Sequence, residues 1–496
     1  MTRMSPAQTH IARAIVGGLL ALSILSAPAQ AFAWGNGTSR SGNGFGTHDW
    51  VLTEANRMAA TQGATWVNAS VALPVTDDPD TRFRDTKDHV YDRWGKANGS
   101  AHKKVAAYYA KAVSALAAGD IDSASRALGL LSHYFADANN PLNTDNIAAE
   151  RRMHARYDAA VDERLNAIGK NRGWVAYDGY NHVGSASALT VSSARSAHGS
   201  YKTLVAQYNR RGYNRTVRII STRSINRATN GLADIIVSIQ EDAALAGSSP
   251  QVNAHQGVTT DGTANSDYWI FHTTWIQRYG PDWVSLATTT TPFSNDDGTV
   301  LEGFAASESE SSSRTLSAEA HLGTGTYYEG KLYVPAENWP SVTNQHIFEF
   351  DALTLKRLRA VETSPATHEV AAATVAPDEA GIDRLYIASF NDSSRLFKYD
   401  LSTLKLLGEM ELSPAPPVGI QGLTYRDDTF FLSTGRSRNL GRIYTADRST
   451  GKTRLVYTST LPGWHEGIAW RNKLLLWLID HTSSDSRVRY FRLPGF

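Results

Sequence analysis

The chain has 496 residues, of which 42% are hydrophobic and 20% charged, and its formal net charge is +1. This length favours two or three domains over a single one. The composition is ordinary for a globular protein, and the balanced charge gives no support for a broad nucleic-acid-binding or membrane-binding surface. The sequence contains no cysteine, so an exported form would depend on core packing and metal ions rather than on disulfides.

The first residues predict export. Arg3 and Arg13 precede an apolar run from Ile15 to Ile24, and Ala31-Phe32-Ala33 has the small-residue pattern of a cleavage site. We predict a signal peptide over residues 1–33 and a secreted product with no integral membrane segment. A short membrane anchor is the alternative, but the apolar run is shorter than the roughly 20 residues that span a bilayer.

The region after this signal has helical periodicity, and we predict an all-α domain over residues 34–246. Apolar residues recur three and four positions apart, as they do on the buried face of an amphipathic helix. Ser100 is a predicted N-cap, and a further helix is expected within 215–244. The residues that carry the two clearest stripes are Val105, Tyr109, Val113 and Leu116, and Met153, Tyr157, Val161 and Leu165.

The pattern changes near residue 247 to short runs rich in β-branched and aromatic residues, so we predict a linker over 247–252 and a β-propeller over 253–496. A turn motif that begins at Asp351 returns at Asp400 and Asp447, which are 49 and 47 positions apart (351 to 400 to 447). Repeats of this length in an all-β region are typical of propeller blades. A Ser/Thr/Glu-rich insertion, roughly 287–313, is expected to be a surface loop.

A second repeated motif supports about five blades. Five short openings stand before apolar strands: His255-Gln256-Gly257, His321-Leu322-Gly323, His368-Glu369-Val370, Ile420-Gln421-Gly422 and His465-Glu466-Gly467. The four histidines could form a ring around the central channel and bind a metal or ligand. The alternative, which we favour, is that they are repeat residues that hydrogen-bond neighbouring blades.

The strongest chemical signal is a pair of His-x-x-x-Asp motifs in the helical region. His133 and Asp137 lie four residues apart on a predicted helix and share one face, as do His154 and Asp158. One such pair is usually an ordinary helix contact. Two pairs close in sequence favour a metal site, because facing helices can present imidazole and carboxylate ligands to one ion.

Other candidate ligands accompany these pairs. Asp77, Asp78 and Asp80 precede His89, and His48 follows the glycine-rich segment that comes after the predicted signal. Nitrogen and oxygen ligands without cysteine fit zinc in a hydrolytic site.

These motifs resemble the bacterial zinc-dependent phospholipase C family, which includes phosphatidylcholine-cleaving enzymes and clostridial alpha-toxin. The resemblance covers roughly residues 34–244, and several motifs in the family's order are more specific than any one of them. The motifs that carry it are Trp34 as the mature N-terminus, Gly46-Thr47-His48, Asp88-His89-Val90-Tyr91-Asp92, His133-Tyr134-x-x-Asp137-x-x-x-Pro141 and His154-x-x-Tyr157-Asp158.

The resemblance implies a set of zinc ligands. Trp34 would bind zinc through its α-amino nitrogen and carbonyl oxygen, together with His48. Asp137 would bridge to a second zinc held by His89, His133 and Asp80, although Asp77 or Asp78 could take the place of Asp80.

The third zinc of the family is held by two histidines and a glutamate, and here the sequence departs from the pattern. Asn143 stands where the first histidine belongs, and Asp158 replaces the glutamate beside His154. Because an amide is a poorer zinc ligand than imidazole, we predict two zinc ions and leave the third open.

The resemblance implies a secreted zinc-dependent phosphoric-ester hydrolase, with phospholipase C cleavage of phospholipids as the leading activity. Asp80 is the candidate general base, although it could serve only as a ligand. One alternative is a P1-type zinc nuclease or phosphatase, the only reading in which nucleic acid would be a substrate. The other is a non-catalytic surface-binding propeller protein with a degenerate helical domain. The partner of the propeller is not predicted.

Overall fold

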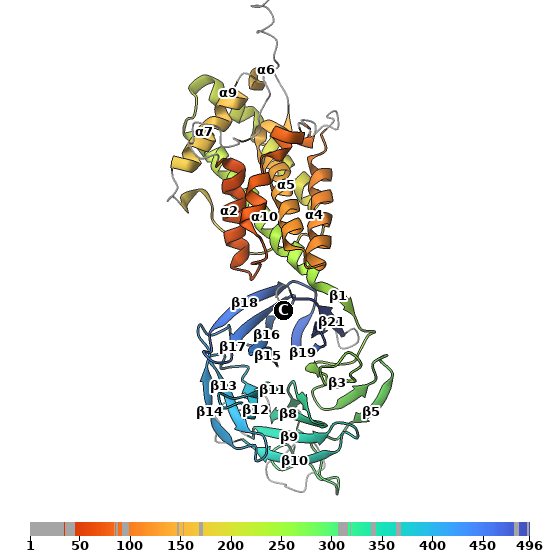
Figure 1. The fold of residues 1–496 in the computed structure, drawn as a ribbon. Coiled ribbons are helices and arrows are strands. Elements are labelled where there is room, and N and C mark those ends of the chain that lie inside the picture. The colour runs from red at the N-terminus through yellow and green to blue at the C-terminus, as the bar shows by residue number, and fades with distance from the viewer. Residues whose placement is uncertain are drawn as a thin grey trace, which may run out of the picture.

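The computed structural model places a helical region before a five-bladed β-propeller (Figure 1). It describes residues 34, 45–83, 85, 88–91, 99–145, 148–151, 153–167, 172–305, 316–317, 319–338, 344–363, 369–480, 486–493 and 496. The predicted signal peptide, the glycine-rich segment before Phe45, Asp92 and His368 therefore lie outside the described residues. No helix in the described ranges is long and apolar enough to cross a membrane.

The helical region packs around two long buried helices, α5 and α10. Its longer helices are α2 (Thr47–Ala60), α4 (Ala101–Ala117), α5 (Ile121–Asn139), α7 (His154–Ala167), α8 (Ala186–His198), α9 (Tyr201–Arg211) and α10 (Arg215–Ala244). Short helical segments are α3 (Ala69–Ala72), η1 (Leu73–Val75), η2 (Pro79–Phe83), η4 (Pro141–Thr144), α6 (Ala148–Arg151) and η5 (Arg172–Trp174). The predicted helix within 215–244 and the stripe from Val105 to Leu116 are confirmed as α10 and α4.

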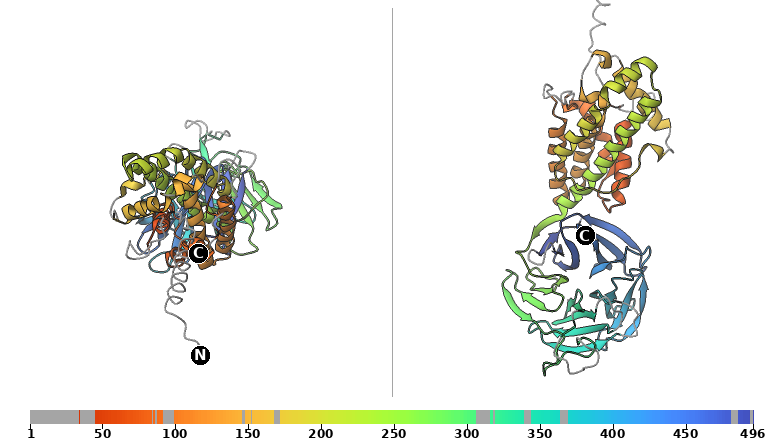
Figure 2. Two further views of the ribbon diagram at one scale, coloured as in Figure 1. Left: turned by 90° about the horizontal axis from the view of Figure 1, so that it is seen from above. Right: turned by 180° about the vertical axis from the view of Figure 1, so that it is seen from behind.

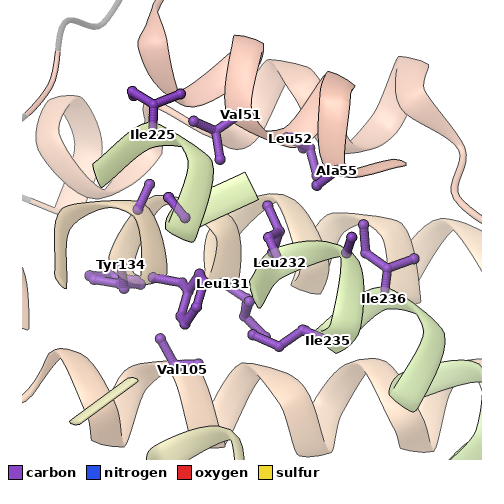
Figure 3. Packing of buried hydrophobic residues seen from close by; sticks show 14 of the residues in the cluster. Val51, Leu52, Ala55, Val105, Leu131, Tyr134, Ile225, Leu232, Ile235 and Ile236 are labelled. Carbon is purple, nitrogen blue, oxygen red and sulfur yellow. The ribbon is translucent and has the colours of Figure 1, made fainter. Parts of the chain in front are cut away.

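The core of this region is formed where α2, α4, α5 and α10 meet (Figure 3). Val51, Leu131, Leu232 and Ile236 are all fully buried there. Burial of one such side chain contributes about 1.5–3 kcal/mol, so this packing fixes the positions of polar groups carried by the same helices. Gly129 permits a close approach, because a Cβ at this position would lie 2.2 Å from the carbonyl oxygen of Ala72.

The propeller consists of five antiparallel sheets, which confirms the predicted blade number. Blade 1 contains β2 (Gly257–Thr259), β3 (Tyr268–Phe271), β4 (Ile276–Tyr279) and β5 (Ser285–Thr289). Blade 2 contains β6 (Ala320–Leu322), β7 (Thr326–Tyr328), β8 (Lys331–Asn338), β9 (His346–Asp351) and β10 (Arg357–Glu362). Blade 3 contains β11 (Ala372–Pro377), β12 (Asp383–Ala388), β13 (Arg395–Asp400) and β14 (Leu406–Glu411).

The fourth blade is regular and the fifth closes the ring. Blade 4 contains β15 (Ile420–Arg426), β16 (Thr429–Ser437), β17 (Leu440–Asp447) and β18 (Thr453–Ser459). Blade 5 contains β19 (Trp464–Arg471), β20 (Leu474–Asp480), β21 (Arg487–Phe491) and β1 (Leu245–Ser248). Because β1 follows α10 directly and pairs with β21, the predicted linker over 247–252 is in part a strand that joins the two ends of the propeller.

The Asp turn motif connects the last two strands of blades 2, 3 and 4. Asp351 Oδ1 accepts hydrogen bonds from the backbone nitrogen and hydroxyl of Thr354, both at 2.7 Å, and Asp400 and Asp447 repeat the arrangement.

The prediction that residues 287–313 form a surface loop is wrong in part. Phe293 and Phe304 are buried against Phe348, because this insertion covers the outer core of blade 2.

The two halves contact each other at the base of the helical region (Figure 2). Gln240 donates a hydrogen bond to the carbonyl of Val456 at 3.1 Å, and Thr458 donates one to the carbonyl of Gln62 at 2.8 Å. Gln62 follows the end of α2, whereas His48 lies in the first turn of this helix. A helix of this length spans roughly 20 Å, so the propeller does not cover the end of α2 that carries His48.

Candidate metal centre

The centre of the site is the last part of α5. His133 and Asp137 lie one turn apart on this helix, with His133 Nε2 3.2 Å from Asp137 Oδ2. The other ring nitrogen of His133 donates to the carbonyl of Thr76 at 2.6 Å. This bond orients the ring and directs Nε2 toward the carboxylate.

Three further side chains converge on this pair from α2, η2 and the segment around residue 89. His89 Nδ1 lies 2.8 Å from Asp137 Oδ2 and 3.0 Å from His133 Nε2. Asp80 Oδ1 lies 3.4 Å from His89 Nδ1 and 3.7 Å from His133 Nε2. His48 Nε2 lies 3.5 Å from Asp137 Oδ1, and its ring stacks on that of His133.

The spacing of these atoms fits metal ligation. Ligands about 2.0–2.1 Å from a tetrahedral zinc ion lie about 3.4 Å from one another. The distances given above run from 2.8 to 3.7 Å and bracket this value. Two overlapping ligand sets result, His48 with Asp80 and His133, and His89 with His133 and Asp137, and the ligand atoms of each set lie within 4.8 Å of one another.

Buried polar atoms without partners provide a second test of the fit. His48 Nε2 and Asp137 Oδ1 are buried and have no hydrogen-bond partner. Leaving such atoms unsatisfied costs free energy, roughly 1–3 kcal/mol for each group. A divalent cation would satisfy both atoms, since Asp137 Oδ1 faces His48 while Oδ2 faces His89 and His133.

His48 and Asp137 have the protonation states of metal ligands. At His133, in contrast, the effect of burial is outweighed by Asp137 and Asp80, which raise the pKa of this ring to about 9, so a metal ion would displace its proton. Complete burial, together with the neighbouring His133, lowers the pKa of His48 to about 3, so this ring is neutral at pH 7. Burial opposes ionisation of Asp137, but the adjacent His133 and His89 hold the pKa of this carboxyl well below its usual range. A neutral imidazole and an ionised carboxylate are the forms that bind zinc.

Of the three aspartates in the acidic segment, Asp80 faces the cluster. Asp78 instead lies 3.4 Å from Arg82 and 3.6 Å from Arg126. Burial, followed by the charge of Asp49, raises the pKa of Asp77 to about 7. The structure therefore places Asp80, rather than Asp78, beside His89 and His133.

Trp34 also lies at the metal cluster. Its side chain is fully buried in the helical core, and its backbone lies near enough to His48 to contribute to the pKa of that ring. The backbone groups predicted to chelate zinc therefore lie beside the predicted partner histidine.

The second His-x-x-x-Asp pair forms a neighbouring part of the site. His154 Nε2 lies 3.3 Å from Asp158 Oδ2, and both atoms are buried without a hydrogen-bond partner. Burial raises the pKa of Asp158 to about 7, and the charge of Asp137 contributes to this shift. Asn140, not Asn143, donates to Asp158, at 3.1 Å, while the amide nitrogen of Asn143 is buried without a partner.

Sequence reasoning missed two carboxylates that orient the histidines. Glu150 accepts from His154 Nδ1 at 2.7 Å and from the Tyr201 hydroxyl at 2.9 Å. Asp85 lies 3.1 Å from His89 Nε2 and is bonded by Lys104 and Tyr134. Glu150 lies four residues before His154, so the i, i+4 spacing that identified the ligand pairs could also have identified it.

The propeller histidines do not form a ring in the described residues. His255 pairs with Asp480 of blade 5, and His465 Nε2 lies 3.2 Å from the hydroxyl of Ser459 in blade 4. His321 stands 3.7 Å from Glu337 within blade 2. The first two contacts join neighbouring blades, as the favoured alternative predicts.

No family model and no characterised protein sequence matches the chain. Among solved structures it is similar to a bifunctional GH43-CE protein of Bacteroides eggerthii (14% identity, 50% of this chain and 34% of that one, TM-score 0.35). It is similar to the arabinanase Arb43A of Bacillus subtilis (15%, 50% and 96%, TM-score 0.35). It is also similar to the alpha toxin of Clostridium absonum (12%, 64% and 94%, TM-score 0.31). The chain thus spans about a third of the Bacteroides protein.

These matches correct one prediction. Most of the structures named for an enzyme are glycosidase-type propellers, such as the arabinanase and a β-xylosidase, and they point away from a phospholipase C. The prediction of a zinc-dependent phospholipase C-type phosphodiester hydrolase is therefore wrong as made. At these identities the likenesses concern fold alone and assign no substrate to this chain.

Proposed function

We propose that the chain is an exported metal-dependent hydrolase of phosphate esters of the nuclease and phosphatase kind, with its reaction centre in the helical region. The observation that carries the proposal is the position of Asp137, whose carboxylate oxygen Oδ1 faces His48 while Oδ2 faces His89 and His133. Such a bridge is typical of sites with two metal ions, which clamp the attacking and leaving oxygens of a phosphoryl group.

The residues suited to hold the ions are those that converge on Asp137. They are Trp34 through its backbone, His48, Asp80, His89, His133 and Asp137, with His154 and Asp158 as a weaker adjoining pair. Zinc, when bound, would neutralise the phosphate charge and lower the pKa of a water molecule.

The chain's own groups supply orientation and proton transfer. The Thr76 carbonyl and the Asp85 carboxylate fix the rings of His133 and His89. Asp80 is the general-base candidate, because its side chain is 9% exposed whereas those of His133 and Asp137 are fully buried. A carboxylate at the accessible edge of the cluster can accept a proton from water that attacks the substrate.

Asp158 favours the nuclease and phosphatase kind within this class. It stands where the phospholipase C pattern has a glutamate, and its shorter side chain is bonded by Asn140. The ester itself would be recognised by its phosphate, since metal-centred binding needs no broad basic surface.

The experiment is a parallel hydrolysis assay on the zinc-loaded full chain. The substrates are p-nitrophenyl phosphate, bis-p-nitrophenyl phosphate, a single-stranded oligonucleotide and p-nitrophenyl arabinofuranoside. The proposal predicts turnover of at least one phosphate ester, with loss of turnover in Asp80→Asn. Turnover of the glycoside alone, or no turnover of any phosphate ester, would contradict it.

A further inference from the structure

A cavity of about 250 Å³ lies in the centre of the propeller. Its lining comes from four blades: Gln256 from blade 1, His321 and Glu337 from blade 2, Glu369 and Phe390 from blade 3, and Gln421 from blade 4. The cavity is far from the metal cluster, which lies at the opposite end of α2 from the propeller.

The repeated His/Ile-Gln/Glu-Gly openings build this cavity. Their glycines converge at the propeller axis, where Thr324 donates to the carbonyls of Gln256 and Gln421, each at 2.8 Å. A Cβ on Gly257 or Gly467 would lie 2.3 or 2.2 Å from the Thr324 hydroxyl oxygen. The glycines therefore close the axis, and the polar residues just before Gly257, Val370 and Gly422 line the cavity.

Two atoms in this cavity lack partners. Glu337 is 3% exposed, lines the cavity, and has no hydrogen-bond partner at Oε2. His321 Nε2 is also buried without a partner, and burial lowers the pKa of this ring to about 4, which leaves it neutral. Burial, followed by the charge of Glu369, raises the pKa of Glu337 to about 9, so the two carboxyls hold one proton between them at pH 7.5. A ligand that displaces this proton and presents N–H donors would satisfy Glu337 Oε2, and His321 Nε2 in the ring tautomer protonated at Nδ1.

The charge of the cavity is negative. Glu369 is 4% exposed and accepts a hydrogen bond from the side-chain amide of Asn391, which favours its ionised form. Among the described residues that line the cavity, none is Lys or Arg. A phosphate ester, the substrate class proposed for the helical region, is therefore excluded from this cavity by charge.

We propose that this cavity is a second binding site, which takes the primary ammonium group of a small organic amine. The ammonium directs N–H donors to Glu337 Oε2 and His321 Nε2, and the charge of Glu369 balances its positive charge. Phe390 supplies an aromatic surface, which attracts cations through the quadrupole of the ring. The amide side chains of Gln256 and Gln421 are placed to bond polar groups elsewhere on the ligand.

The test is calorimetric or NMR titration of the full chain at pH 7.5 with n-butylammonium chloride. Neutral n-butanol, sodium butyrate and glucose serve as comparison ligands. We expect butylammonium to bind about tenfold or more tightly than n-butanol, because only the ammonium can replace the proton that Glu337 and Glu369 hold between them. Butyrate is expected not to bind.

Three variants test whether the amine binds in the propeller cavity. Glu337→Gln is nearly isosteric and is expected to lower the amine affinity about tenfold or more, whereas the exposed Glu411→Gln changes it less than about twofold. Phe390→Leu is expected to lower it about twofold to fivefold. Unfolding temperatures of all three variants verify that they are folded.

Two results would overturn the assignment. One is n-butanol or glucose binding as tightly as butylammonium to the unaltered chain, which would indicate a site for neutral hydroxyls. The other is unchanged amine affinity in folded Glu337→Gln. Neither result tests the proposed function of the metal cluster. That proposal is tested separately by the phosphate-ester assay.

Discussion

Both halves of this molecule bury histidines and carboxylates, but they arrange them in opposite ways. In the helical region, residues from α2, η2, α5 and the segment around residue 89 converge within 2.8–3.7 Å of one another. In the propeller, His255 and His465 have separate partners in neighbouring blades. Packed helices bring their candidate ligands within bonding distance of one another. The blades give their repeated histidines separate partners, and it is the residues after these positions, Gln256, Glu369 and Gln421, that share a central cavity. Convergence of the histidines, rather than their number, thus distinguishes the two regions.

The largest effect is expected on the rate of hydrolysis, from a substitution that disrupts the metal cluster of the helical region. In Asp137→Asn, the amide cannot present anionic oxygens both toward His48 and toward His89, so phosphate-ester hydrolysis is expected to fall by about 1,000-fold. Rates on the best phosphate-ester substrate of the panel measure this. Asp178→Asn, an exposed change in the same region, serves as control and should leave the rate within about twofold. Equal rates in the two variants would remove Asp137 from the reaction centre.

The next prediction concerns the axis of the propeller. Gly467→Ala would place a methyl group 2.2 Å from the Thr324 hydroxyl oxygen and 2.8 Å from Gly257 Cα, so two blades must move apart. We expect the free energy of unfolding to fall by about 3 kcal/mol or more in urea titrations. Gly408→Ala, whose added Cβ would meet nothing within 4 Å, should change it by less than about 1 kcal/mol. A tolerated Gly467→Ala would show that the axis is not closed as described.

A smaller effect is expected where a carboxylate orients a candidate ligand. Glu150→Gln keeps the shape of the side chain but weakens the bond to His154 Nδ1. Affinity for the most weakly held metal ion should fall about tenfold, as for other residues that orient metal ligands. Competition with a chromogenic chelator measures this. Glu163→Gln, an exposed change on α7, the helix that carries His154, should match the unaltered protein, and a matching Glu150→Gln would refute the orienting role.

The smallest expected effect is a change in the pH dependence of stability. Burial, followed by the charge of Glu369, raises the pKa of Glu337 well above its usual value. The folded state therefore holds a proton that the unfolded state releases above about pH 4.5, so stability falls as the pH rises from about 5 toward the folded pKa. The slope from this group is at most about 1.4 kcal/mol per pH unit. Glu337→Gln should flatten the decline of urea midpoints between pH 5.5 and 8; an unchanged slope would contradict the assigned shift.

Local spacing predicted much of the fold and of the cluster. The helix at 215–244, the five blades and the shared faces of His133 with Asp137 and His154 with Asp158 follow from periodicities of a few residues or from repeats. The position of Asp80 beside His89 came from the family resemblance.

Features that depend on distant contacts were missed. Phe293 and Phe304 lie in a segment of polar composition, and their burial depends on the core of blade 2. The sequence predicted a linker where strand β1 ends, because the strand with which it pairs, β21, lies more than 200 residues later in the chain. Asp85 reads as an ordinary acidic residue until the fold places it beside His89, Lys104 and Tyr134. Such pairings have no local signature.

The central claim is that the convergent cluster holds divalent metal ions, and metal content tests it most directly. Mass spectrometry of the purified protein, with its N-terminus determined in the same sample, should find about two zinc ions per chain. A form with one residue added before Trp34 should contain less, because the backbone of Trp34 lies beside His48. A protein that begins at Trp34 and contains no zinc, even after incubation with the metal, would contradict the account.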